Sequence, residues 1–144
     1  MQVQVQPYLF FEGSCEEALQ YYSRHLGAKI DVVMRYKDSP QAQPPGMNVP
    51  GDKVMHAAFH VGETQVLASD GMCNGSGKAK LEGFSLALTA RDDAEAKRFF
   101  NALADGGQVK MPLAATFFAS SFGMLIDKFG MHWMVLAPKQ GGHG

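Results

Sequence analysis

The stretch Y-L-F-F-E-G-S-C-E-E-A-L-Q-Y-Y, from Tyr8 to Tyr22, returns as L-A-L-T-A-R-D-D-A-E-A-K-R-F-F from Leu86 to Phe100. At this offset of 78 residues Ser14 pairs with Asp92, and each is followed three residues later by Glu. Ser or Asp with Glu at that spacing is the signature of a helix N-terminus closed by a capping box. Each copy therefore predicts a strand that leads into a helix, and the repeat predicts two copies of one supersecondary unit.

Hydrophobic periodicity, β-branched runs and Gly or Pro stops predict the other helices and strands of both copies. Each copy is predicted to be a strand, a helix and three further strands, which places the chain in the α+β class. The first copy comprises 3–11 (strand), 14–26 (helix), 29–36, 54–61 and 64–69 (strands), and the second comprises 84–90 (strand), 92–104 (helix), 108–113, 117–126 and 132–137 (strands).

Length and composition predict one domain. A chain of 144 residues that is 46% hydrophobic can bury a single core. We therefore expect one domain over 1–144, made of modules 3–70 and 82–138 and joined by a Gly-rich linker at 71–81. The Pro- and Gly-rich segment 38–52 is expected to be a long loop, either a lid over a pocket or a disordered segment.

The charge pattern excludes several classes of partner. The net charge is −1 and no run of like charges occurs, so we expect neither a nucleic-acid partner nor a membrane partner. The N-terminus has no signal-peptide pattern, and no apolar run is long enough to span a bilayer. Cys15 and Cys73 do not form a disulfide framework, and we expect a cytoplasmic protein.

Several segments resemble a known superfamily: Pro7-Tyr8-Leu9, the A-L-Q-Y-Y-x-x-x-L-G-A run at 18–28, His56-Ala57, Ser69-Asp70 and F-G-M-L-I-D-K-F-G-M-H-W at 122–133. They resemble the PhnB-like branch of the vicinal oxygen chelate superfamily, whose fold includes glyoxalase, bleomycin-resistance and dihydroxybiphenyl dioxygenase proteins. Some members of this branch carry a 3-demethylubiquinone methyltransferase label. The resemblance implies that each βαβββ module curls a mixed sheet into a cup, that a pocket lies inside the cup, and that modules pair.

The usual metal ligands of the superfamily are expected to be absent. Carried over by the resemblance, their positions fall on Pro7, Ala58, Phe84 to Leu86 and Met134. None of these side chains suits a divalent cation, so no metal or other cofactor is expected.

Alternation along the strand at 54–61 places His56, Ala58 and His60 on one face. The two imidazoles could form a displaced metal site, completed by His132 or Asp70. However, positions i and i+4 of a strand lie roughly 13 Å apart, too far to share one ion. We therefore expect these histidines to hydrogen-bond a ligand or to serve the structure.

An apolar pocket is the predicted functional site, because aromatic and Met residues are abundant in the cup strands. We expect its ligand to be a small apolar or aromatic molecule. The residues expected to line this pocket are Tyr8, His56, Ala58, Ser69, Asp70, Phe84, Thr116, Phe118, Trp133 and Met134.

Three functions remain open at this stage. The first is metal-independent capture of a small molecule, and the second is a metal-dependent glyoxalase- or dioxygenase-like enzyme with displaced ligands that include His56. The third is a dimerisation scaffold whose cup is filled by its own side chains. Methyltransferase activity is a weaker alternative, because the first strand ends in F-F-E-G-S-C and lacks the Gly-rich turn of nucleotide-binding folds. A homodimer is expected, since curved sheets with one helix each leave edges and apolar surface uncovered.

Overall fold

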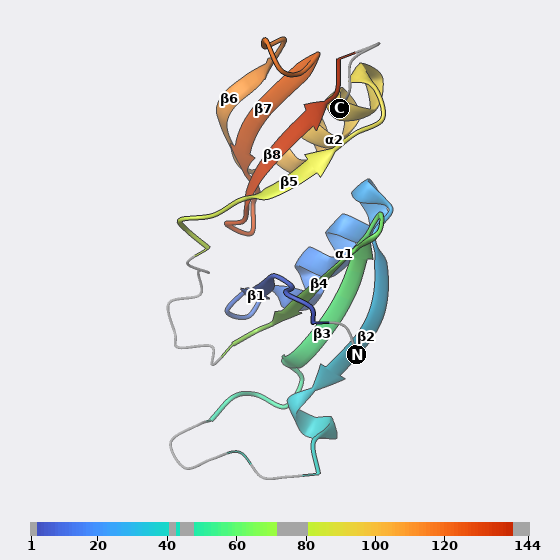
Figure 1. The fold of residues 1–144 in the computed structure, drawn as a ribbon. Helices are drawn as coiled ribbons and strands as arrows, with labels where there is room; N and C mark the ends of the chain where they lie inside the picture. Colours follow the sequence, from blue (N-terminus) through green and yellow to red (C-terminus); the bar gives the residue numbers. More distant parts are fainter. Residues whose placement is uncertain (1–2, 41–42, 44–47, 72–80, 140–144) are drawn as a thin grey trace. The chain divides into compact units, whose positions relative to one another are not determined.

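The computed structural model describes residues 3–40, 43, 48–71 and 81–139. The chain divides into two compact units, residues 1–80 and 81–144. In each unit one helix covers one face of a four-stranded sheet (Figure 1).

The first unit is built on the sheet order β1-β4-β3-β2. Strands β1 and β4 are parallel, and the other neighbours are antiparallel. A short 3-10 turn at Tyr36–Asp38 follows β2. The elements are β1 (Tyr8–Phe10), α1 (Cys15–Leu26), β2 (Lys29–Arg35), β3 (Val54–Val61) and β4 (Thr64–Ser69).

The second unit repeats this arrangement with the order β5-β8-β7-β6, in which β5 and β8 are parallel. Its elements are β5 (Leu86–Thr89), α2 (Asp93–Ala104), β6 (Gln108–Ala114), β7 (Ser121–Ile126) and β8 (His132–Ala137). Two mixed four-stranded sheets with one helix each confirm the predicted fold class. Whether the units form one domain stays a prediction, and the predicted linker at 71–81 lies mostly outside the described residues.

The two copies differ in register by one residue between helix and strand. The helices begin at Cys15 and Asp93, which keeps the offset of 78. The residue that follows the first strand gives a different offset. Phe11 N donates to Ser69 O in the first unit, and Ala90 N donates to Leu136 O in the second. Phe11 and Ala90 are therefore equivalent, and they lie 79 residues apart. The extra residue of the first unit lies in the turn at Glu12 and Gly13, which both have positive φ. A slip of one residue exchanges the two faces of a strand, so Tyr8 and Leu86 are not structural equivalents.

The strands predicted over 3–11 and 117–126 show the largest differences from the sequence prediction. The strand expected over 3–11 pairs with β4 only from Tyr8 to Phe10, and Val3 and Val5 are almost fully exposed. The strand expected from Phe117 starts at Ser121, because Thr116 organises a turn before it. The Thr116 hydroxyl accepts from the backbone N–H groups of Phe118 and Ala119, a bond pattern that competes with strand pairing.

The core of each unit lies between the helix and the sheet. In the first unit Tyr22 of α1 packs at 6.0 Å from the ring of Phe59 on β3, and both side chains are fully buried. In the second unit a Cβ on Gly123 of β7 would lie 2.7 Å from Phe100 of α2, so the absence of a side chain there lets the helix approach the sheet. These contacts identify which face of each sheet is covered by its helix.

Candidate functional site

The face of the first sheet that lies opposite α1 is called the open face here. Since Phe59 points toward α1, alternation places His56, Ala58 and His60 of β3 on the open face. The register then adds their neighbours across the sheet. Leu67 pairs with both Ala58 and Tyr8, and Ser69 pairs with Phe10. Val32 pairs with Ala58 and Met34 pairs with His56.

The open face carries an exposed apolar strip. Tyr8, Phe10, Val32 and Met34 keep 36%, 51%, 40% and 40% of their surfaces exposed. The rings of Tyr8 and Phe10 lie 5.0 Å apart, and the Tyr8 hydroxyl lies 3.1 Å from Nδ1 of His56. The strip therefore combines apolar surface with one polar pair, as ligand sites commonly do.

A chain of polar side chains crosses one end of the open face. Gln6 Nε2 donates to Gln65 Oε1 at 2.7 Å, and Gln65 Nε2 donates to Asp31 Oδ2 at 3.4 Å. His60 Nδ1 lies 2.5 Å from the same Asp31 oxygen. We call Gln6, Gln65, Asp31 and His60 the polar band.

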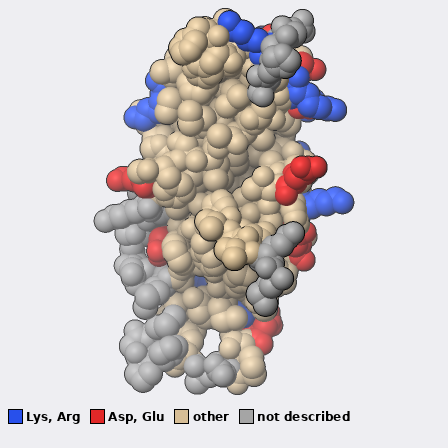
Figure 2. All heavy atoms as spheres, viewed as in Figure 1, with Lys and Arg blue, Asp and Glu red and all other residues tan. Residues whose placement is uncertain are grey.

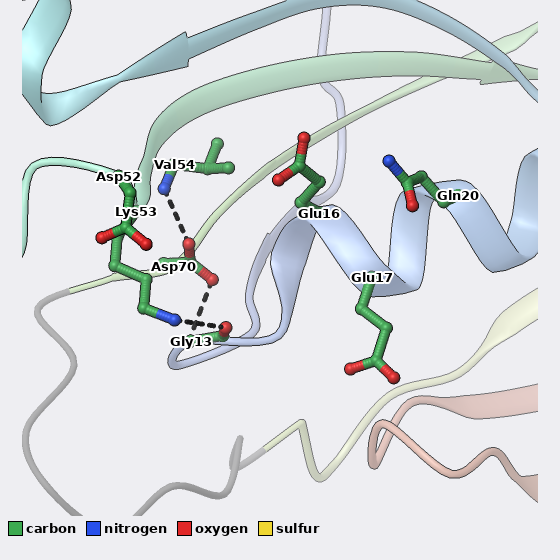
Figure 3. A pocket seen from close by; sticks show the side chains of 8 residues that line it. All are labelled: Gly13, Glu16, Glu17, Gln20, Asp52, Lys53, Val54 and Asp70. Atoms are coloured by element: carbon green, nitrogen blue, oxygen red, sulfur yellow. Dashed lines mark hydrogen bonds between the residues drawn. The ribbon is translucent and has the colours of Figure 1, made fainter.

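Asp70, expected to line the pocket, is 2% exposed and lies at the N-terminus of α1. One carboxylate oxygen accepts from the N–H groups of Gly13 and Cys15 at 3.0 and 2.8 Å, and the other accepts from Val54 N at 2.7 Å (Figure 3). The predicted capping box of Ser14 and Glu17 is wrong, since Ser14 makes no side-chain cap and donates to Phe11 O instead. Asp70 supplies the cap from the end of β4 and joins the helix to two strands.

A hollow of about 270 Å³ opens beside this cap, lined by Gly13, Glu16, Glu17, Gln20, Asp52, Lys53, Val54 and Asp70 (Figure 3). Several of its polar groups already have partners. The Glu16 carboxylate binds Arg35, which lowers the pKa of Glu16, and Lys53 Nζ donates to Gly13 O at 3.2 Å. Nearby Cys15 is buried, and burial together with the charges of Asp70 and Glu16 raises its pKa. A thiol that stays protonated is no nucleophile.

The other residues expected to line the pocket belong to the second unit, and they do not share one face of its sheet. Trp133 pairs with Leu125 and lies on the face that α2 covers, where its indole N–H donates to Asp127 Oδ2 at 2.9 Å. Met134 points to the opposite face, which is turned toward the viewer in Figure 1 and is almost uncharged in Figure 2. Phe84 and Phe118 are exposed and lie outside the strands.

Ser69 and Ala58, which were also expected to line the pocket, lie in the first unit. Both are buried in the first sheet, and the Ser69 hydroxyl accepts from Gly71 N at 3.0 Å. The structure thus brings Tyr8, His56, Ala58 and Ser69 together on the open face. That all these residues line a ligand pocket stays a prediction.

Sequence reasoning placed His60 on this face but missed its partners in the polar band, above all Asp31. A register shift between Ile30 and Val32 marks a bulge in β2. A bulge lets two consecutive side chains lie on one face, so Asp31 and Val32 both reach the open face. Within the described residues, no three His, Cys, Asp or Glu side chains lie close enough together to hold a metal ion. No helix in the described part of the chain is long and apolar enough to cross a membrane.

Residues 3–136 match the model of a protein family described as 3-demethylubiquinone-9 3-methyltransferase. Protein YjdN of Escherichia coli (strain K12) is 38% identical over 141 residues, which cover 93% of this chain and 95% of YjdN. Protein PA1353 from Pseudomonas aeruginosa has a crystal structure with 42% identity and a TM-score of 0.82, over 95% of this chain and 98% of that chain. A putative 3-demethylubiquinone-9 3-methyltransferase, PhnB protein, from Bacillus cereus is 28% identical with a TM-score of 0.76, over 94% and 99% of the two chains.

More distant structures show the fold alone. A glyoxylase/bleomycin resistance protein/dioxygenase domain from Frankia sp. EAN1pec is 15% identical, with a TM-score of 0.62 over 99% of this chain and 96% of that chain. The fosfomycin resistance protein FosX from Listeria monocytogenes is 8% identical with the same TM-score, over 98% and 97% of the two chains. The vicinal oxygen chelate fold expected from the sequence is therefore confirmed.

Proposed function

Because the chain belongs to the 3-demethylubiquinone-9 3-methyltransferase family of PhnB-like proteins, we propose that it captures a small apolar or aromatic molecule. The ligand binds on the open face of the first sheet without a resident metal ion. The observation that carries the proposal is the exposed strip of Tyr8, Phe10, Val32 and Met34 beside the Tyr8–His56 pair. Apolar side chains left in water on a sheet face favour an apolar ligand.

The Tyr8–His56 pair supports ligand orientation. A phenol and an imidazole joined by a hydrogen bond still offer further donor and acceptor positions. The polar group of a ligand could replace the water molecules bound to Tyr8 and His56, while the apolar body of the ligand covers the strip. Such a site binds and orients a molecule, and capture alone requires no bond to be broken.

Methyl transfer, which the family description names, is not part of this proposal. S-adenosylmethionine-type cofactors usually bind at a Gly-rich turn that follows a strand of a doubly wound parallel sheet. In this chain each sheet has one parallel pair, and the turn before α1 is occupied by the Asp70 cap. The arrangement favours capture over methyl transfer.

Ligand titrations with NMR detection test the proposal. The expected result is saturable binding of small aromatic compounds, with shifts confined to the open-face residues of β1 to β4 and no conversion of the compound. Met34→Asp places a charge in the strip and should abolish binding. Val5→Asp is the control, because Val5 is 94% exposed and lies outside the strands. Shifts confined to other surfaces, or binding that survives Met34→Asp, would reject the site.

Metal analysis tests the metal-free part of the proposal. Untagged, dialysed protein should contain no stoichiometric divalent metal by plasma mass spectrometry, before or after exposure to Zn²⁺, Ni²⁺, Mn²⁺ or Fe²⁺. The reason is that His56 faces Tyr8 and His60 faces Asp31, which leaves the two imidazoles in separate pairs. Stoichiometric metal that disappears in His56→Ala would instead make the protein a metalloenzyme candidate.

A further inference from the structure

We propose that the open face selects molecules that carry a protonated amine on an apolar or aromatic body, with the amine held by Asp31 and His60. This inference rests on the proposed function and specifies the chemistry of its ligand.

The Asp31 carboxylate fixes the direction of every bond in the polar band. An ionised carboxylate only accepts hydrogen bonds, so Gln65 must turn its amide nitrogen toward Asp31. The Gln65 carbonyl oxygen then accepts from Gln6. For the same reason the His60 nitrogen that faces Asp31, Nδ1, carries a proton.

Two acceptor atoms of the polar band are still available for a ligand. Asp31 Oδ1 and His60 Nε2 have no hydrogen-bond partner within the described residues. The side chains of His60 and Asp31 are 39% and 32% exposed, so water or a ligand can reach them. With the ring in its neutral form, both atoms accept hydrogen bonds and neither donates one.

The Asp31 carboxylate supplies a negative charge at this place. Within the described part of the chain, His60 is the only basic side chain within ion-pair distance of Asp31, and in its neutral form this ring would leave the carboxylate charge uncompensated. An ammonium group has three donors, no acceptor and a positive charge, which complements both features. A ligand carboxylate would meet charge repulsion and two acceptors without donors.

The apolar body has a place next to the band. Val32 follows Asp31 on the same face because of the bulge, and it pairs with Ala58. The Tyr8 hydroxyl reaches His56 from β1 to β3, so the Tyr8 side chain extends across β4 toward the centre of the face. The Tyr8 ring, which lies beside His56, can pack against the aromatic body of such a ligand. A compact arylalkylamine therefore matches the band and the strip together.

Three probes share one phenylethyl body and differ in the polar group at its end: 2-phenylethylamine, 2-phenylethanol and 3-phenylpropanoate. Each is titrated into the full chain and followed through the Gln65 side-chain amide, the His60 ring and the open-face backbone signals. The expected order of affinity is amine, alcohol, carboxylate, with the amine at least about ten-fold tighter than the carboxylate. Asp31→Asn should lower the amine affinity to that of the alcohol and leave the alcohol unchanged.

Asp105→Asn is the matched control, since it removes the same charge from an exposed position in the other unit. It should leave the order of affinities intact. The inference is overturned, and the proposed function stands, if all three probes bind the strip equally or if Asp31→Asn keeps the preference for the amine. It is also overturned if the amine shifts only the hollow around Glu16 and Glu17. If no probe binds at millimolar concentration, both the inference and the proposed function fail.

Discussion

At the residue scale, Asp70 shows how one carboxylate can organise the entry to a helix. Its two oxygens accept from three backbone N–H groups, two of them buried and the third partly buried. Two of these groups belong to the start of α1, where the helix dipole also favours a negative charge. The cost of burying a carboxylate is offset by charge-assisted bonds, so Asp70 acts on stability.

Replacement of Asp70 by Ala should lower the free energy of unfolding by about 3 kcal/mol, because two buried donors and one partly buried donor lose their acceptor. Urea denaturation followed by circular dichroism measures the loss. Asp52→Ala is the control, since Asp52 is exposed and lines the same hollow, and it should change stability little. A small effect of Asp70→Ala together with weaker ligand binding would show that Asp70 is a ligand anchor instead.

The residues of the site were predictable only where alternation is regular. His56, Ala58 and His60 share a face as the sequence predicts, because β3 has no bulge between them. Asp31 could not be found in this way, since the bulge in β2 changes its face. Trp133 was expected in the pocket but lies under α2, and the sequence has no signal that fixes the face of β8 in advance.

At the element scale, Asp93 fastens the start of α2 to the segment that leads into β7. Its carboxylate accepts from the hydroxyls of Ser120 and Ser121 at 2.5 and 2.7 Å. These hydrogen bonds, that of Ser120 first, lower the pKa of Asp93. The folded protein therefore holds this carboxyl ionised at pH values where the unfolded chain already takes up a proton.

This attachment should make stability depend on pH in a defined direction. A group with a lowered folded pKa contributes stability above its unfolded value of about 3.9, and the contribution is lost as the pH falls through the folded value. Asp93→Asn should therefore be less stable than the natural chain near neutral pH, and the two should converge in acid. Urea midpoints measured from neutral pH into acid check this, with Asp105→Asn as the control. A constant difference at every pH would contradict the assignment.

The two helices were predicted almost to the residue, whereas the strands before them were misaligned. Caps and Gly stops are local signals, so Asp92 accepts from Glu95 N as its sequence predicts, and α1 ends before Gly27, which has positive φ. The relation between β1 and β5 depends instead on one extra residue in the turn at Glu12 and Gly13. An alignment without a gap cannot show that residue, and it therefore exchanges the faces of the two strands.

At the scale of the whole molecule, each sheet ends in two edge strands, β1 and β2 in the first unit and β5 and β6 in the second. Edge strands expose unpaired backbone groups, and exposed apolar side chains such as Val109 and Met111 lie on the edge strand β6. Pairing with a second copy would cover such surface. Sedimentation velocity should therefore give a mass about twice the 15.6 kDa of one chain, and a monomer at micromolar concentration would contradict the expected homodimer.

The prediction of one domain can be tested with a reporter in one unit and a substitution in the other. Trp133, the sole Trp, is 2% exposed in the second unit, so its fluorescence reports unfolding of that unit. Asp70→Ala weakens the first unit. If the chain unfolds as one domain, the substitution should lower the urea midpoint measured by Trp133 fluorescence as much as the midpoint measured by circular dichroism. If the units unfold independently, the fluorescence midpoint will stay at its original value while circular dichroism shows an earlier transition, and the single-domain prediction is then wrong.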